Sequence, residues 1–215
     1  MIGFPLGVLF TNAFEWYAHK YVLHGTPGKP GEGRHSPVPS SMKSHWTHHR
    51  IARRSEFHED GYREGLKNER VKLEVRALFV LAGATTLVAP VAPFFTLGTY
   101  YGAVRYFYIH RKAHLDPEWA KKNVPWHYDH HMNTNQDANW CVTRPWFDYV
   151  MGTRVISSPE LMESNPLGMR LPGFVERPLN RLARRLSPRA FAKLDENRRQ
   201  EAANRTAGFD LPMPD

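Results

Sequence analysis

The chain has few of the residues that anchor small disulfide-linked or cysteine-ligated folds. Its 215 residues include one cysteine, Cys141, which excludes an internal disulfide framework and a cysteine-based zinc site. The zinc-protease pattern His-Glu-x-x-His is also absent, because His58-Glu59 is not followed by the second histidine. A metal site in this chain must therefore use other ligands.

Acidic residues are outnumbered by basic ones. The chain has 21 Asp and Glu against 29 Lys and Arg, so its formal charge is +8, and its pI is about 9.7. This balance suits nucleic acid, an anionic membrane surface or an acidic protein partner equally well. The basic C-terminal region lacks interleaved aromatic residues and any recognised nucleic-acid-binding module. We therefore expect no nucleic-acid partner.

Charge is missing from one long stretch and nearly missing from another. Residues 77–104 carry no charged side chain, and residues 2–18 carry a single acid. A helix over residues 2–18 is about 25 Å long, close to the thickness of a hydrocarbon core. Pro90 and Pro93 divide the second stretch into two arms. We expect a membrane helix over 2–18 and a helical hairpin over about 77–109. A buried hairpin of a soluble bundle is the alternative, and the mean hydropathy of −0.55 keeps it open.

The second arm contains two glycines four residues apart, Gly98 and Gly102. Small residues at this spacing favour close contact with another helix. The alternative is that they leave space for an acyl or polyene chain. Packing is the interpretation that we prefer.

Basic residues indicate how the apolar stretches are oriented. They follow the first stretch or the hairpin, namely Lys43, Arg50, Arg53, Arg54, Arg105, Arg111, Lys112, Lys121 and Lys122. Because cytoplasmic loops carry an excess of Lys and Arg, both sets are expected on the cytoplasmic side. The short N-terminus then lies on the other side.

Composition divides the chain at about residue 155. Residues 1–155 hold the apolar stretches and all twelve histidines, so we expect them to form one membrane-embedded domain. Within it, residues 25–44 are rich in Gly, Pro and Ser and predict a loop, and Asp116-Pro117 predicts a helix start. Residues 156–215 form a basic amphipathic segment and a tail. The segment suits an anionic bilayer, and a helix that closes the domain is the alternative. We find no convincing strand pattern.

Histidine is the residue in excess. Ten of the twelve histidines fall in four clusters, whereas His35 and His58 stand outside. The clusters are HKYVLH (His19, His24), HWTHHR (His45, His48, His49), HRKAH (His110, His114) and HYDHHM (His127, His130, His131). Two clusters have the same form, His-x-x-His-His, and the two pairs follow apolar stretches. If the helices continue past the bilayer, all four clusters meet.

Helical spacing predicts how each cluster points. Positions i, i+3 and i+4 share one face of a helix, so each His-x-x-His-His cluster is expected to present three imidazoles together. His110 and His114 are one turn apart. His19 and His24 are five residues apart, about 140° on a regular helix. They either reach different points or lie where the helix loosens near Gly25.

Ten imidazoles in one patch point to metal. They repel one another if protonated and are costly to bury unpaired, whereas neutral imidazole is a common ligand of iron, zinc and copper. Two ions with four or five nitrogens each fit the count, and open positions that bind O₂ favour iron. Scattered surface histidines are the alternative. Glu15, one turn before His19, and Asp129, inside the last cluster, are candidates to orient the imidazoles, unless they are solvated acids.

These four clusters resemble, in order, the histidine boxes of the fatty acid hydroxylase/sterol desaturase superfamily, and HKYVLHG is similar to the first box of bacterial carotene hydroxylases. The following stretch looks like the ending of that family, with Asn139-Trp140, Phe147-Asp148 and Gly152-Thr153. The resemblance covers about residues 10–155. The chain departs from the family in being short and in having Cys141 where glycine is common.

The resemblance implies an all-α fold, with integral membrane helices that extend into a cytoplasmic helical cap holding a His-rich dimetal centre. It implies ten histidine ligands, two non-haem iron ions, O₂ as co-substrate and hydroxylation of an unactivated C–H bond in a fatty acyl, sterol-like or carotenoid lipid. Desaturation, aldehyde cleavage and metal binding without catalysis are the alternatives. The sequence has no haem domain, flavin fingerprint or iron–sulfur motif, so electrons must come from an external donor. A ferredoxin or a cytochrome b5-like protein would suit the basic face.

Overall fold

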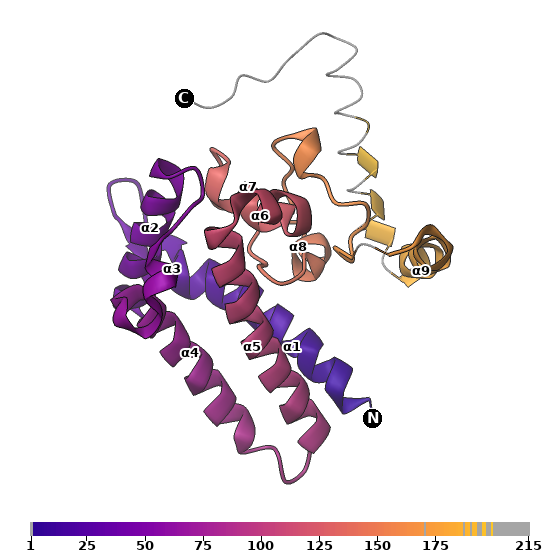
Figure 1. The fold of residues 1–215 in the computed structure, drawn as a ribbon, viewed down its shortest axis with the longest axis horizontal. Coiled ribbons are helices and arrows are strands. Elements are labelled where there is room, and N and C mark those ends of the chain that lie inside the picture. The colour runs from indigo at the N-terminus through magenta and orange to yellow at the C-terminus, as the bar shows by residue number, and fades with distance from the viewer. Residues whose placement is uncertain are drawn as a thin grey trace.

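The computed structural model describes residues 2–169, 171–186, 188–189, 191–192, 195–196 and 199, and this part of the chain is mostly helical (Figure 1). The helices are α1 Gly3–Ala18, α2 Pro39–Arg54, α3 Gly61–Glu64, α4 Glu69–Thr86, α5 Pro93–Leu115, α6 Pro117–Asn123, α7 Pro125–Met132, α8 Trp146–Val150 and α9 Gly173–Leu186. Short turns are η1 His19–Leu23, η2 Gly65–Lys67 and η3 Pro159–Leu161. The expectation of a helical fold is confirmed, except for one small antiparallel pair, β1 Thr26–Pro27 and β2 Arg34–His35.

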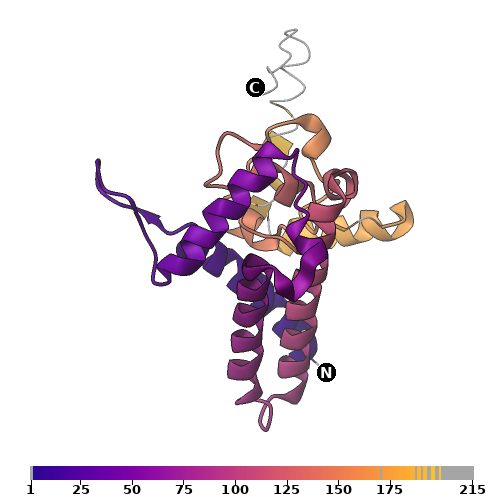
Figure 2. The ribbon, with the colours of Figure 1, turned by 60° about the vertical axis from the view of Figure 1, so that its left-hand side comes forward.

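Three helices form a stem that projects from the rest of the molecule. In this stem α4 and α5 lie side by side and α1 packs on α5 (Figures 1 and 2). α4 ends at Thr86 and α5 begins at Pro93, which occupies the first turn where no backbone N–H is needed. α5 then runs to Leu115, well past Arg105. The expected helical hairpin is confirmed, with its turn at the prolines.

Glycine allows α1 to lie directly against α5. A Cβ on Gly98 would be 2.2 Å from the carbonyl oxygen of Phe4, and one on Gly7 would be 2.2 Å from that of Phe95. One on Gly102 would be 2.1 Å from Thr11 Oγ1. The spacing of Gly98 and Gly102 therefore serves helix packing, as preferred above, and the two backbones fill the place of a lipid chain.

Gly98→Ala is expected to destabilise the protein although alanine favours helix. The new methyl group must push α1 away from α5, and such overpacking costs about 1–3 kcal/mol. Gly83→Ala in α4 is the matched control, because nothing lies within 4 Å of its Cβ position. Urea denaturation should show a lower unfolding free energy for the first variant only. Equal stability of both variants would contradict the observed helix contact.

The expected membrane-spanning helices are not confirmed. Among the described residues, no helix combines the length and the apolar character that crossing a membrane requires. The stem nevertheless exposes many large apolar side chains. They include Phe4, Leu6, Leu9, Phe10, Phe14, Phe79, Val80, Leu87, Val91, Phe94, Leu97, Tyr101, Val104 and Tyr108.

The end of α1 changes its winding where the first histidine pair lies. His19–Leu23 is a π-helical turn, and the backbone N–H of His24 donates to the carbonyl oxygen of His19 at 2.9 Å. A π turn joins residues i and i+5, so it brings the two rings to 5.3 Å between centroids. Gly25 follows at φ 71°, a left-handed conformation that favours glycine. The expected loosening near Gly25 is confirmed, and it starts at His19.

The loop and cap signals are confirmed with shifted bounds. α2 begins at Pro39, so the loop that was expected over 25–44 is shorter and contains β1 and β2. Asp116 caps α6 as expected, because its side chain accepts from the N–H of Trp119 at 3.0 Å. α6 and α7 follow α5 directly, which places the last histidine cluster above the stem.

Contacts cross the expected boundary at residue 155. Ser157 donates to Asp129 in α7, and Glu163 pairs with Arg154. The chain up to about residue 169 thus belongs with the histidine-bearing part. α9 lies apart from it, to the right in Figure 1. The expected tail over 196–215 lies outside the described residues, except for residues 196 and 199.

Candidate metal centre

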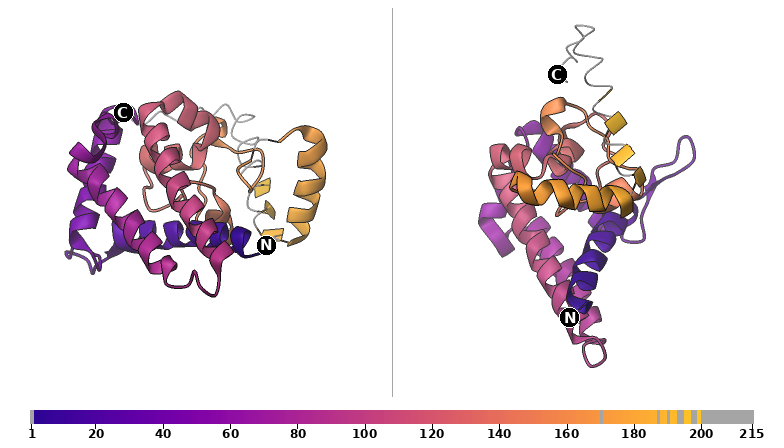
Figure 3. Two further views of the ribbon diagram at one scale, coloured as in Figure 1. Left: turned by 60° about the horizontal axis from the view of Figure 1, so that its bottom comes forward. Right: turned by 90° about the vertical axis from the view of Figure 1, so that its right-hand side faces the viewer.

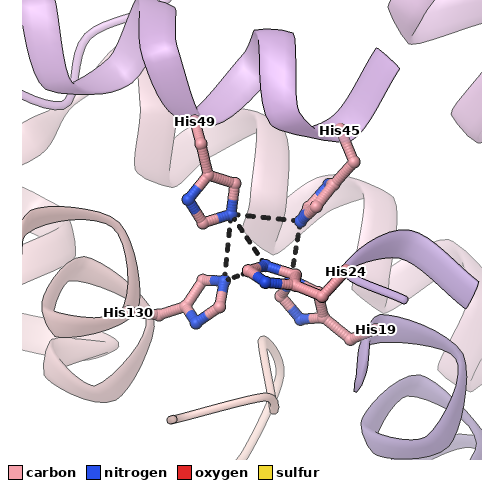
Figure 4. Close-up of side chains that lie close together, drawn as sticks. All are labelled: His19, His24, His45, His49 and His130. Atoms are coloured by element: carbon pink, nitrogen blue, oxygen red, sulfur yellow. Dashed lines mark hydrogen bonds between the residues drawn. The ribbon is translucent and has the colours of Figure 1, made fainter. Parts of the chain in front are cut away.

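Nine of the ten clustered histidines form two buried groups at the cap end of the stem. In each group one nitrogen from every ring lies within 4.8 Å of all the others. The first group is His19, His24, His45, His49 and His130 (Figure 4), and the second is His48, His110, His114 and His131. The groups are adjacent, because the rings of His49 and His131 are 4.1 Å apart between centroids. The four clusters of the sequence do meet in space.

The two His-x-x-His-His clusters do not each serve one group, contrary to the expectation of three imidazoles on one face. In α2, His45 and His49 join the first group while His48 joins the second. In α7, His130 and His131 also separate. Neighbouring positions on a helix diverge by about 100°, so adjacent histidines point into different groups. Each doubled cluster therefore bridges both groups.

Backbone carbonyls fix the tautomers in the first group. His19 Nδ1 is 2.6 Å from the oxygen of Trp140, and His130 Nδ1 is 2.6 Å from that of Ala138. Because a carbonyl can only accept, both Nδ1 atoms carry the proton, and in the neutral rings Nε2 has a free lone pair. These lone pairs face the interior of the group.

Distances within the first group match one ion. The Nε2 atoms of neighbouring rings are 2.9–3.2 Å apart. Nitrogens that ligate one ion at about 2.0–2.1 Å lie about 3 Å apart when they are at right angles. A cation between these atoms satisfies the converging lone pairs together, which hydrogen bonds among them cannot. The donor set fits a metal ion.

The second group presents unpaired nitrogens. The Nε2 atoms of His48, His110 and His131 are buried and have no hydrogen-bond partner among the described residues. His114 donates from Nδ1 to the oxygen of Phe57 at 2.9 Å, which leaves its Nε2 as an acceptor. Unpaired buried polar atoms are rare in folded proteins. Their convergence makes this group a second candidate metal site.

Burial keeps the imidazoles in the form that binds metal. It lowers the pKa of nine of them, and neighbouring imidazoles lower it further in most. These are His19, His24, His45, His48, His49, His114, His127, His130 and His131. Neutral imidazole is the ligating form, so the folded chain presents ligands that do not first have to lose a proton.

Carboxylates that the sequence analysis missed hold several rings from behind. His48 Nδ1 contacts Glu59, which also binds Arg70, and His110 Nδ1 is 2.9 Å from Glu74 Oε1. Although burial alone raises the pKa of Glu59, the hydrogen bonds from His48 and Arg70 hold it at about 2. Glu59 is thus an anion that fixes the orientation of His48. Its only sequence signal was the incomplete His58-Glu59 pattern, and Glu74 had none.

The two predicted orienting acids lie elsewhere. Glu15 accepts from the N–H groups of Val142 and Thr143 at 2.9 and 3.0 Å, not from His19. Asp129 accepts from Arg154 at 3.0 Å and from the N–H of Ser157 at 3.2 Å. Both predictions assumed that closeness in sequence means closeness to the ring. In fact each carboxylate points away from the histidine beside it.

Glu15 supports the centre indirectly, through the segment that follows the last histidine cluster. Asp148 accepts from the N–H groups of Trp140 and Cys141, both at 2.8 Å. Glu15 holds the next two residues. The loop thus fixed carries the carbonyl of Trp140 that binds His19. This explains why an acid in α1 and the Phe147-Asp148 pair accompany the histidines.

Three histidines lie outside the two groups. His127 is buried and lies outside both groups, although its Nε2 is 3.3 Å from that of His114. His35 has a side chain exposed by 67% and lies in β2, and His58 pairs with Asp60 at 3.1 Å on the surface. His35 and His58 therefore stand apart from the centre, as their sequence positions indicated.

Glu59→Gln is expected to weaken metal binding without unfolding the chain. The amide is nearly the same size, yet it cannot supply the charge that His48 and Arg70 both use. Loss of such an orienting partner typically costs 10–100-fold in metal affinity. Competition with a chelator measures the affinity. Glu118→Gln is the control, since this carboxylate lies 82% exposed on α6. Equal affinity in the two variants would show that Glu59 does not position His48.

A family model described as "Fatty acid hydroxylase" matches residues 4–153, most of the chain. These residues include both histidine groups and the segment through Thr153. No curated protein and no solved structure gives a significant match.

Proposed function

The chain belongs to the fatty acid hydroxylase family, within the fatty acid hydroxylase/sterol desaturase superfamily, and on that premise we propose that it is an O₂-dependent hydroxylase of a lipid. The observation that carries this proposal is the pair of adjacent histidine groups. Two non-haem iron ions held there would supply the activation of O₂ that attack on an unactivated C–H bond needs. Five residues would hold one ion and four the other, with His127 beside the second.

The protein's own contribution is to position and to protect the centre. Glu59 and Glu74 accept from the Nδ1 atoms of His48 and His110, and carbonyls hold His19, His114 and His130. These contacts keep each Nε2 aimed inward. Trp140 is nearly fully buried beside His24 and His130, so it excludes water from the first group. A dry, oriented ligand set is what the cofactor chemistry requires of a protein.

The stem supports a lipid substrate and a membrane location. Its exposed apolar side chains lie along α1, α4 and α5. Exposed apolar area of this extent marks an interaction with protein or membrane. In this proposal the stem enters the bilayer from the cytoplasmic side and the cap stays in the cytoplasm. An acidic ferredoxin or cytochrome b5-like donor would deliver electrons to the basic cap.

Lipid profiling tests the reaction. A host that expresses the chain should accumulate a lipid that gains one oxygen atom, and a host that expresses His48→Ala should not. A lipid that loses two hydrogens would instead indicate desaturation, and a lipid with a shortened hydrocarbon chain would indicate aldehyde cleavage. Identical lipid profiles, together with two zinc ions and no O₂ consumption after iron loading, would support metal binding without catalysis.

A further inference from the structure

α9 has an apolar side and a basic side, and each has exposed side chains. None of its side chains is buried. Phe174, Leu182 and Leu186 are exposed by 80%, 54% and 77%. Leu182 and Leu186 are four residues apart and share one face with Val175 and Leu179. An amphipathic helix that closes the domain would bury this face, whereas Leu182 and Leu186 of α9 are exposed.

The other side of α9 is rich in arginine. Its basic residues are Arg177, Arg181, Arg184 and Arg185, against the single acid Glu176. Glu176 is engaged at the helix start, where it accepts from Asn165 at 2.8 Å. Arg184 pairs with Asp195. Among the described residues, Arg177, Arg181 and Arg185 form no ion pair with an acid, which gives this side a net positive charge that suits an anionic surface.

The orientation of α9 relative to the stem also fits a helix that lies on a membrane surface. In the right panel of Figure 3, α9 runs across the axis of the stem, level with the cap end of the stem. In Figure 1 the stem lies in the page while α9 is seen nearly end-on, so the two views agree. When the stem enters a bilayer along its normal, α9 therefore lies parallel to the membrane plane. Helices that bind in the interface have this orientation and this division of apolar and basic sides.

We infer that α9 is a docking helix for anionic phospholipid headgroups, with Val175, Leu179, Leu182 and Leu186 in the interface. The inference rests on the membrane location proposed above, and it adds a preference for charge that the stem alone does not have. The stem's exposed residues are apolar and bind neutral and anionic bilayers alike, whereas α9 distinguishes them. The helix also limits how the cap can tilt, because it holds the cap at one height above the bilayer.

A fluorescent probe on α9 tests contact directly. In the full-length protein, Leu182→Cys on the apolar side of α9 is labelled with an environment-sensitive fluorophore, and the natural Cys141 is fully buried and stays unlabelled. Vesicles of phosphatidylcholine with one third phosphatidylglycerol should shift the emission to the blue, and phosphatidylcholine alone should not. Glu118→Cys on α6 is the control and should respond to neither. Equal shifts with both vesicles, or none, would overturn the inference.

Charge variants measure how much the arginines of α9 contribute to partition onto anionic vesicles. Arg177→Gln combined with Arg181→Gln should weaken partition onto the anionic vesicles by roughly 30-fold, since each basic residue near such a surface contributes about fivefold. Lys121→Gln with Lys122→Gln removes the same charge from α6 and should change partition little. Equal loss in both would assign the effect to net charge and overturn the docking role. A dimer that dissociates on Leu182→Cys would overturn it in favour of a second copy of this chain on the apolar side of α9.

The inference and the proposed function fail in different ways. Wild-type protein that prefers anionic vesicles but lacks product and iron would contradict the hydroxylase alone. Protein that makes product, yet partitions equally onto both vesicles, would contradict the docking helix alone. Bound metal serves as the check that each variant is folded, because the two histidine groups combine residues of η1, α2, α5 and α7 with His24, which follows η1.

Discussion

Replacing His130 by alanine is expected to reduce bound iron from two ions per chain to about one and to bring hydroxylation to background. His130 Nε2 lies 3.2 Å from that of His24 and 3.1 Å from that of His49, so its loss opens the first group. His48→Ala should do the same to the second group. Metal analysis of the purified variants and product formation by mass spectrometry measure the two effects.

Two natural controls lie outside the groups. His35→Ala and His58→Ala should retain both ions and wild-type turnover, because their side chains are on the surface. Normal turnover by the His130 variant would remove the first group from the mechanism. A variant that keeps both ions but loses activity would assign His130 to another task than holding metal.

Arg154→Met is expected to destabilise the fold by about 3–5 kcal/mol, the cost of leaving buried charges without their partner. Arg154 is completely buried, and it pairs with Asp129 at 3.0 Å and with Glu163 at 2.8 Å. Methionine fills the space but leaves both carboxylates in the interior. Because Asp129 lies in α7 among the last histidine cluster, the loss should also lower metal content. Urea denaturation of the apo protein gives the stability directly.

The surface pair between Arg63 and Asp60 provides the comparison. Both side chains are about two-thirds exposed, and exposed pairs are worth about 0–1 kcal/mol. Arg63→Met should therefore leave the unfolding free energy nearly unchanged. Similar stability of the two variants would mean that Arg154 does not hold α7 to the segment after residue 155.

Local signals in the sequence predicted much of the architecture. The prolines at 90 and 93 located the hairpin turn, and Asp116 located the start of α6. The four histidine clusters were expected to meet, and nine of their ten residues do. Each of these predictions depends on the spacing of residues within about one helical turn, or on a residue type that is favoured at one position, such as proline in a turn or aspartate at a helix start. Such patterns are preserved whatever the tertiary fold.

The partners of the histidines depended on distant contacts. Glu59 is 11 residues from His48, and Glu74 is 36 residues from His110. The acids nearest in sequence, Glu15 and Asp129, were predicted instead, and their carboxylates bind a loop and an arginine. The division of each cluster between two groups also followed from how α2 and α7 face one another. Regular helix geometry in one segment contains no information on that arrangement.

Anomalous X-ray scattering at the iron edge, from crystals of the iron-loaded protein, tests the central claim most directly. The account predicts two peaks: one among His19, His24, His45, His49 and His130, and one among His48, His110, His114 and His131. A single peak, or iron bound at residues outside both groups, would contradict it.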